Sequence, residues 1–387
     1  GTLLMLYVPA HDFRFRRYKV IDQMEAEKID TLLLFKQESM YYLTGYDSSD
    51  YSLFQCMVLT ATGKYFLFTH AANLMQARQT STFETIHIWR EHEGADPTVQ
   101  LVDIMERIQC KRRNAGIEYD SYGLSGAAAR RLDASLRRLV RRRIDASFLV
   151  SQIRLIKSPM EQSYLCHAGK IGDQALDVGL NSIIPGKTEI PVLAAMQNHI
   201  LSEHGDYSAG RFVAGSGFGA SLCNYRTTRR YMEADEQLTL EWAGVFRHYH
   251  APLMRTVILG RPHPRHHTMF DIARDALLAC EAKLQSGTSC GEIFDEYARI
   301  LDKAGFGAYK LNNCGHAVGA SFPPSWVDWP MLYAGNPVKL RVGMVFFIRI
   351  VVLDLNAGLV QTLGRSTVID DHGPKPLSSL KLELIIH

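Results

Sequence analysis

The hydrophobic pattern of the first half predicts strands and helices in alternation. Val20, Ile21 and Met24 recur at helical spacing between residues 18 and 28, and the apolar run 31–35 predicts a buried strand. Further strands are expected at 56–60, 65–69 and 114–119, the first two joined by a tight turn. This alternation predicts an α/β layered domain over residues 1–150.

The second half begins with a strong helix signal. Ser158 is a suitable N-cap and Pro159 fits the first helical position, so a long helix should follow. Thr188 is predicted to cap a second helix. Apolar segments at 237–242, 256–259 and 344–352 predict strands. Residues 151–387 therefore form a second predicted domain of α+β type.

Seven arginines lie between Arg130 and Arg143. They could form an anion-binding patch. The alternative is the solvated face of one helix that directs Leu132, Leu136 and Leu139 inward, and we favour it because the rest of the chain balances this charge.

Composition narrows the class of protein. The 387 residues are 47% hydrophobic and 21% charged, so two or three domains with sizeable cores are expected. The net charge of +3 gives no reason to expect nucleic acid or an anionic membrane as partner, and no apolar run is long enough to span a bilayer. Seven cysteines without a CxxC pair exclude a zinc ribbon and favour a reduced, cytoplasmic protein.

Three segments of the second half carry candidate chemistry. Glu241 lies on an apolar strand, inside a pattern typical of a β-hairpin that continues through His250 to Arg255. His316 has a glycine on one side and Ala317-Val318-Gly319 on the other, and Arg349 interrupts an otherwise apolar strand. An acidic or basic side chain in such a strand is costly to bury unless it has a partner or a function.

These segments resemble the creatinase and methionine aminopeptidase superfamily, also called peptidase family M24, whose catalytic domain has the pita-bread fold. The matching segments, in chain order, are 42–46 (YLTGY), 157–161 (KSPME), 241–256, 315–319 (GHAVG) and 342–346 (VGMVF). The resemblance covers about residues 15 to 375 and implies a creatinase-type N-terminal domain, a pita-bread C-terminal domain and a homodimer.

The metal ligands of that superfamily are largely missing. Its metal-binding members hold two divalent ions with two Asp, one His and two Glu, because hard cations require anionic oxygen. Here Glu241 and His316 stand at two of the five positions, Pro252 replaces the second Asp, and Arg349 and Arg365 stand at the two Glu positions. Arginine cannot deprotonate to bind a cation. We therefore expect no metal and no other cofactor.

Metal-free branches of the superfamily hydrolyse small C–N compounds, and the chain looks closer to the ectoine hydrolase branch. Residues 321–326 (SFPPSW) also resemble that branch. The resemblance implies that Glu241 is a nucleophile or base, with His316 and His250 as proton donors or orienting groups. The His of these branches near the Thr-Thr-Arg stretch is replaced here by Asn224 or Cys223.

The resemblance and the residue types also suggest binding roles. Arg349 would bind a substrate carboxylate, or alternatively pair with Glu241. Asn224 would orient the substrate, and Trp326 would form an aromatic wall or simply pack in a loop. Tyr51 and Gln55 lie in the segment that reaches the partner's pocket in the family.

Other residues have competing interpretations. Glu241 could instead be a salt-bridged strand residue, and His316 a structural histidine. His248 and His250 are predicted on one face of a strand, either toward the pocket or toward solvent. Cys223 could be a nucleophile, but a buried, inert thiol is the simpler interpretation.

The predicted function is metal-independent hydrolysis of a C–N bond in a small cyclic amidine or guanidino compound. A creatinase-like amidinohydrolase, a metal-dependent Xaa-Pro peptidase and a non-catalytic binding protein of the same fold are the alternatives.

Overall fold

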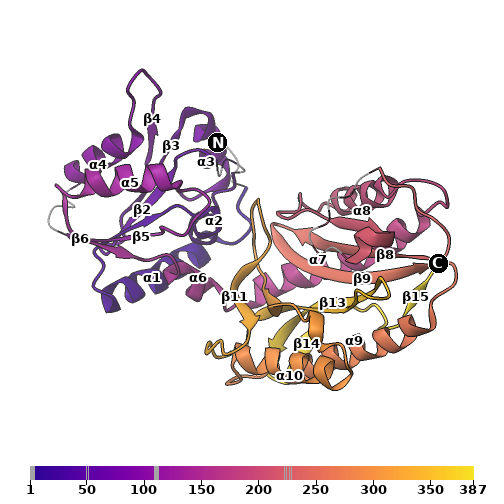
Figure 1. Cartoon of the computed structure of the whole chain (residues 1–387). Coiled ribbons are helices and arrows are strands. Elements are labelled where there is room, and N and C mark those ends of the chain that lie inside the picture. Colours follow the sequence, from indigo (N-terminus) through magenta and orange to yellow (C-terminus); the bar gives the residue numbers. More distant parts are fainter. Residues whose placement is uncertain are drawn as a thin grey trace. The chain divides into compact units, whose positions relative to one another are not determined.

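The computed structural model describes residues 5–48, 50, 52–108, 113–221, 223, 225, 227 and 229–387 (Figure 1). The chain separates into two compact units, residues 1–154 and 155–387. Among the described residues, no helix combines the length and the apolar character needed to cross a bilayer.

A mixed six-stranded sheet forms the centre of the N-terminal unit, in the order β4-β3-β2-β1-β5-β6. Strand β2 runs antiparallel to its neighbours β1 and β3, and the remaining pairs are parallel. The strands are β1 Thr31–Leu34, β2 Cys56–Thr60, β3 Tyr65–His70, β4 Ile86–Trp89, β5 Arg113–Ile117 and β6 Val140–Asp145.

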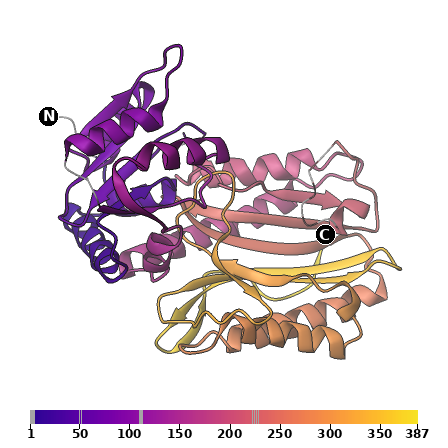
Figure 2. The same cartoon turned by 60° about the vertical axis from the view of Figure 1, so that its left-hand side comes forward.

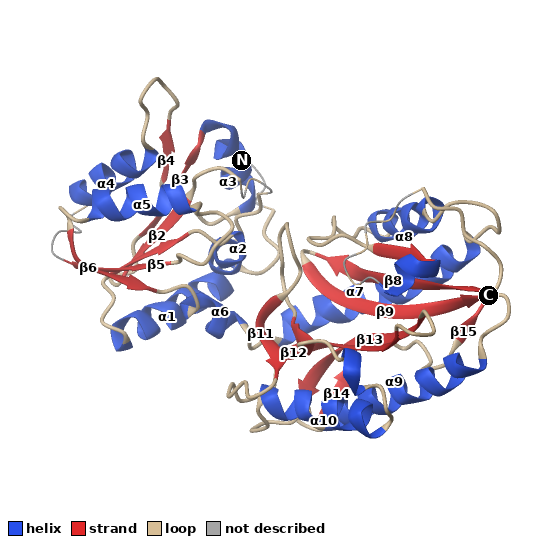
Figure 3. Ribbon diagram, viewed as in Figure 1, coloured by secondary structure: helices blue, strands red, loops and turns tan. Residues whose placement is uncertain are grey.

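Helices cover both faces of this sheet (Figure 3). Leu33 of β1 packs in the core with α4 and α5, whereas Leu32 and Leu34 face the core of α1 and α6. Successive strand residues point to opposite faces, so a strand covered on both sides is a continuous apolar run. The helices are α1 Ala10–Ala26, α2 Gln37–Thr44, α3 Leu74–Thr80, α4 Pro97–Arg107, α5 Gly126–Leu136 and α6 Leu149–Arg154, with a 3₁₀ turn, Ala71–Asn73, before α3.

The arginine-rich segment is not one helix as predicted. Helix α5 ends at Leu136, and Val140 begins the edge strand β6. Leu132 and Leu136 are buried as expected, and Leu139 is buried in the turn after the helix. The prediction of a single helix was wrong because three leucines at helical spacing do not reveal where a helix ends.

In the C-terminal unit, a nine-stranded sheet has the order β11-β10-β12-β13-β9-β8-β7, with β14 beside β13 and β15 beside β9. Its long central strands are curved (Figures 1 and 2). The strands are β7 Val213–Ser216, β8 Glu236–Phe246, β9 Tyr249–Leu259, β10 Asn313–Ala317, β11 Asp328–Tyr333, β12 Val345–Asp354, β13 Leu359–Asp370, β14 Gly373–Pro376 and β15 Ile385–Ile386.

Helices pack on one face of this sheet, α7 and α8 over β8 and β9, and α9 and α10 over β10, β12 and β13. Alternate residues of β12, such as Phe346 and Ile348, lie in that helix-covered core. Arg349 therefore belongs to the opposite face. The helices are α7 Pro159–Asn181, α8 Ile190–Ser202, α9 Pro264–Ala282 and α10 Cys290–Lys303, with 3₁₀ turns at Gly217–Ser221 and Gly307–Tyr309.

The predicted start of α7 is confirmed by a capping box. The Ser158 hydroxyl accepts a hydrogen bond from the Glu161 amide, and the Glu161 carboxylate accepts one from the Ser158 amide. The predicted Thr188 cap is wrong, because Glu189 is the N-cap residue of α8 and Thr188 forms an isolated β-bridge with Tyr231.

Helix α7 lies unusually close to the β8–β9 hairpin. A Cβ atom added at Gly244 would collide with the Ala168 carbonyl oxygen, and one added at Gly172 would lie 3.0 Å from the Gly244 nitrogen. The Trp242 indole donates a hydrogen bond to the Gly172 carbonyl at 2.9 Å. Two glycines therefore allow the helix and the hairpin to approach.

Candidate active site

A cavity of about 320 Å³ opens on the sheet face away from the helices of the C-terminal unit. Four predicted site residues meet there: Glu241 from β8, His316 from β10, Arg349 from β12 and Trp326 from the loop before β11. The full lining is Gly210, Arg211, Val213, Cys223, Tyr225, Glu241, His316, Pro324, Ser325, Trp326, Val327 and Arg349.

Glu241 and Arg349 form an ion pair inside this cavity. The Arg349 Nη1 atom lies 3.4 Å from Glu241 Oε2, a single long contact, and both side chains are largely buried. Among the described residues, no acceptor contacts the buried Nε of Arg349. The guanidinium therefore keeps donors available for a ligand. Burial raises the pKa of Glu241 above that of an ordinary glutamate, and Arg349 limits the rise.

His316 is held as a neutral acceptor. Its Nδ1 lies 2.8 Å from the Ala317 carbonyl oxygen, which can only accept, so Nδ1 carries the proton. Burial lowers the pKa of His316 to about 4, the Ala317 carbonyl opposes this, and Arg349 adds to the lowering. Within the described part of the chain Nε2 has no hydrogen-bond partner. His316 can therefore accept a hydrogen bond from a ligand. A pKa of about 4 argues against the predicted role as a proton donor near neutral pH.

The geometry argues against the acid–base role predicted for His250. Its Nε2 accepts a hydrogen bond from the Ala209 amide at 3.0 Å, and its Nδ1 lies 2.7 Å from the His248 carbonyl oxygen. Both ring nitrogens are thus used by the backbone, burial lowers the pKa to about 3, and His250 does not line the cavity. Its position is that of a structural residue.

His248 does not share a strand face with His250. It occupies the turn between β8 and β9 with φ of 67° and stacks on Phe322 with ring centroids 4.2 Å apart. The alternation of strand residues does not extend through a turn, so the prediction was wrong.

Sequence reasoning missed most of the segment before and after β7. Arg211 and Tyr225 line the cavity although neither was singled out from the sequence, and Gly215 and Gly219 are a signal for Tyr225 in retrospect. Cβ atoms added at these glycines would lie 2.8 and 2.7 Å from the Tyr225 ring. The Tyr225 hydroxyl donates to the buried Glu189 carboxylate at 2.9 Å. Tyr225 is therefore a fixed wall of the cavity.

Cys223 also lines the cavity, although a buried, inert thiol was the simpler prediction. Burial raises the pKa of this thiol, Arg349 lowers it and Glu241 raises it. The thiol is therefore close to the ion pair but mostly protonated near neutral pH.

Three further binding residues were predicted, and the structure describes one of them. Tyr51 and Asn224 lie outside the described residues. Gln55 is buried in the N-terminal unit, where its amide bonds to Tyr46 at 2.8 Å and Thr69 at 3.0 Å. These contacts argue against a role for Gln55 in substrate binding, and the homodimer stays a prediction.

The donor set does not fit a pair of divalent cations. Within the described part of the chain no three His, Cys, Asp or Glu side chains lie close enough to share an ion. Pro252 faces Ala243 across the hairpin, and the residue opposite Arg349 is Gly364. The assignment of Arg365 to the cavity was wrong: Arg365 is on the helix side and binds Glu281 at 2.7 and 3.0 Å.

Comparison with known proteins identifies the family. Residues 164–368 match metallopeptidase family M24, and residues 16–156 match the creatinase/prolidase N-terminal domain. The chain belongs to metallopeptidase family M24. It is a hydrolase of this family, and the predicted combination of a creatinase-type domain with a pita-bread domain is confirmed.

The curated proteins that are similar to this chain are named for different activities. Ectoine hydrolase of Halomonas elongata is 29% identical over 357 residues, covering 87% of this chain and 88% of its own. An Xaa-Pro dipeptidase of Pyrococcus horikoshii is 21% identical, covering 95% and 97%.

Solved structures share the fold of this chain. A dipeptidase from Pyrococcus horikoshii superposes with a TM-score of 0.83 at 21% identity, covering 96% of this chain and 100% of that one. A prolidase from Thermococcus sibiricus gives 0.86 at 17%, covering 98% and 100%.

Proposed function

We propose that the protein hydrolyses a C–N bond of a small cyclic amidine or guanidino compound, as ectoine hydrolase does with ectoine, and that it needs no metal ion. The observation that carries this proposal is the Glu241–Arg349 pair inside the cavity, with His316 beside it. A carboxylate and a guanidinium occupy a site whose described donors are too few for two cations. The 29% identity to ectoine hydrolase supports the substrate class.

In the proposed reaction, Glu241 acts as the base. An amidinium carbon between two nitrogens is electron-poor, and a carboxylate is its natural charge partner. Glu241 takes a proton from water while the water oxygen bonds to this carbon. The C–N bond then breaks, its electrons go to the leaving nitrogen, and the protonated carboxyl group of Glu241 returns the proton there. One water is consumed. A cyclic amidine opens to a single product that carries an amide and an amine, and a guanidino substrate gives a urea and an amine.

The other cavity residues orient this substrate. The free Nε of Arg349 and its spare Nη donors suit a carboxylate. Neutral His316 accepts a hydrogen bond from a substrate N–H through Nε2. Trp326, which is 5% exposed, and Tyr225 provide flat walls for a compact ring.

The test of the proposal is Glu241→Gln. We expect this variant to retain ectoine binding, measured by calorimetry. Hydrolysis, measured by chromatography of the products, should fall by about a thousandfold or more, because the amide cannot accept the water proton. Glu236→Gln, which changes an acidic residue of the same strand outside the cavity, is the control. Turnover that survives in Glu241→Gln would refute the mechanism.

Further assays distinguish the rival activities. A creatinase-like enzyme would release urea from creatine. An Xaa-Pro peptidase would contain two metal ions per chain by mass spectrometry and would lose activity with a chelator. Binding without any turnover would identify a non-catalytic protein, which the neutral, backbone-bonded His250 leaves open.

A further inference from the structure

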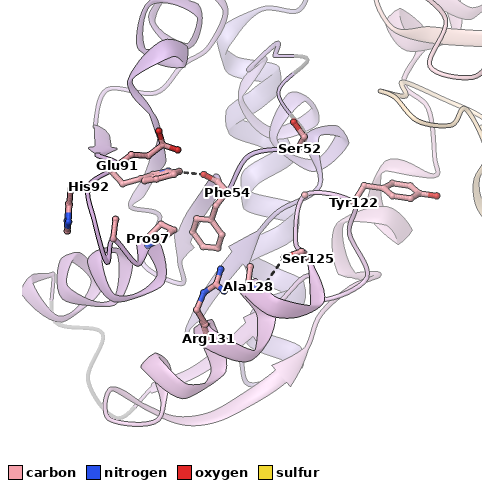
Figure 4. A pocket seen from close by; sticks show the side chains of 12 residues that line it. Ser52, Phe54, Glu91, His92, Pro97, Tyr122, Ser125, Ala128 and Arg131 are labelled. Atoms are coloured by element: carbon pink, nitrogen blue, oxygen red, sulfur yellow. Dashed lines mark hydrogen bonds between the residues drawn. The ribbon is translucent and has the colours of Figure 1, made fainter.

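A second cavity, of about 520 Å³, lies wholly within the N-terminal unit (Figure 4). It lies where β4 ends at Trp89 and where α4 and α5 begin, at Pro97 and Gly126. Strands β4 and β5 point the same way, so both end at this edge of the sheet. Open α/β sheets bind ligands at the carboxyl ends of their strands, and the volume suits a small molecule.

The apolar part of this cavity is rigid. The Trp89 indole donates a hydrogen bond to the Phe54 carbonyl at 2.9 Å. The Phe54 ring packs edge-on against Phe35 and Phe68, with centroid distances of 5.4 and 6.2 Å. Phe54 and Trp89 therefore offer a fixed aromatic surface to whatever enters.

Arg131 supplies the positive charge of the cavity. Its Nε lies 3.9 Å from Asp96, whose carboxylate is already engaged by the Thr98 amide at 2.9 Å as the cap of α4. The terminal nitrogens of Arg131 have no partner among the described residues. Figure 4 shows the guanidinium directed toward Phe54. Two parallel donors beside an apolar ring suit a carboxylate.

Glu91 supplies a negative charge on the other side of Phe54 in the same view. Its side chain is 72% exposed, and its carboxylate lies 3.9 Å from the His70 ring. The cavity therefore offers a cation, Arg131, and an anion, Glu91, beside the aromatic surface of Phe54 and Trp89. A ligand that carries both a negative and a positive charge would match this arrangement.

We propose that this cavity binds a compact amphoteric molecule, an amino acid with a flat apolar side chain. Its carboxylate lies on Arg131, its ammonium group on Glu91 and its side chain on Phe54 and Trp89. This site is separate from the Glu241 cavity and does not depend on the proposed reaction.

Saturation-transfer NMR on the full chain tests the proposal with phenylalanine as probe. We expect Arg131→Gln to weaken phenylalanine binding about tenfold or more, because charged hydrogen bonds are lost. Arg130→Gln, one residue away on α5 and outside the lining, should leave the affinity unchanged. Glu91→Gln should weaken phenylalanine but not 3-phenylpropionate, which lacks the ammonium group.

Three results would overturn the proposal: no phenylalanine binding to the wild type at millimolar concentration, equal affinity in Arg131→Gln, or equal affinity of phenylalanine and 3-phenylpropionate for the wild type. Binding lost in Arg349→Met but kept in Arg131→Gln would assign the probe to the other cavity and would equally overturn it.

Discussion

The Arg349 guanidinium sets the proton affinity of Glu241. Burial raises the pKa of this carboxyl and Arg349 opposes the rise, so replacing Arg349 by Met should raise the pKa further. A protonated Glu241 cannot act as a base, and the acid limb of kcat/KM should therefore move to higher pH. Carboxyl ¹³C NMR titration of Glu241, together with the pH–rate profile, measures the change. Arg349→Lys keeps the positive charge and should hold the pKa of Glu241 close to that of the wild type.

If the Glu241 titration is the same in wild type and Arg349→Met, the 3.4 Å contact has no electrostatic effect and the assigned role of Arg349 fails.

The Cys223 thiol gives a chemical probe of the cavity. Because burial raises its pKa, we expect slow alkylation by iodoacetamide near neutral pH and faster alkylation at higher pH, with loss of ligand binding. The experiment needs a background that carries Cys110→Ser and Cys166→Ser, because Cys166 is exposed and Cys110 lies outside the described residues. Cys223→Ser in that background should be resistant. Full binding after complete modification of Cys223 would show that the thiol does not border the ligand.

At the scale of elements, the contact between α7 and the β8–β9 hairpin depends on Gly244. We expect Gly244→Ala to lower the free energy of unfolding by about 1–3 kcal/mol or more, because the added methyl group meets the Ala168 carbonyl. Urea denaturation followed by tryptophan fluorescence measures this. Gly126→Ala is the control, since nothing lies within 4 Å of its added Cβ. Equal stability of the two variants would contradict the close packing.

The elements themselves were largely predictable, because their signals are local. The Ser158–Glu161 cap and the apolar run of β1 lie within a few residues of sequence. The register between two strands, in contrast, depends on residues that are far apart in the sequence. Gly364 rather than Arg365 faces Arg349, and this follows from the pairing of two whole strands. The His250 partner Ala209 is 41 residues away, so no pattern around His250 could show that its ring is already occupied.

At the scale of the whole molecule, buried neutral histidines make the fold sensitive to acid. The pKa values of His250 and His316 are lowered to about 3 and 4, whereas in the unfolded chain both take up a proton near pH 6.5. Between these values the unfolded state binds more protons, so stability rises with pH and is lost as pH falls from about 6.5 toward 4. Each histidine contributes about 1.4 kcal/mol per pH unit in this window.

Urea unfolding at several pH values between 4 and 7 tests this expectation. His250→Gln should lower the stability at pH 7 but reduce its dependence on pH. A wild-type stability that stays constant over this range would show that the two histidines are not held neutral.

The sequence predicted two domains, 1–150 and 151–387, but it did not predict the outline of the cavity. Its walls come from segments between Gly210 and Arg349, and Glu241, His316, Arg349 and the segment 324–326 were recognisable in the sequence. Arg211 and Tyr225 enter because β7 pairs with β8, a relation that carries no signature of its own.

The place of Gly364 has a practical meaning for the living cell. Gly364 lies opposite Arg349 across β12 and β13, so no second side chain stands beside the guanidinium at this point of the register. In the proposed metal-free reaction, the positive charge of the site comes from the polypeptide itself. This charge belongs to an amino-acid side chain, so every copy of the protein carries it. A chelator such as citrate cannot remove it. If the proposed reaction is right, an organism short of manganese or zinc would keep this activity.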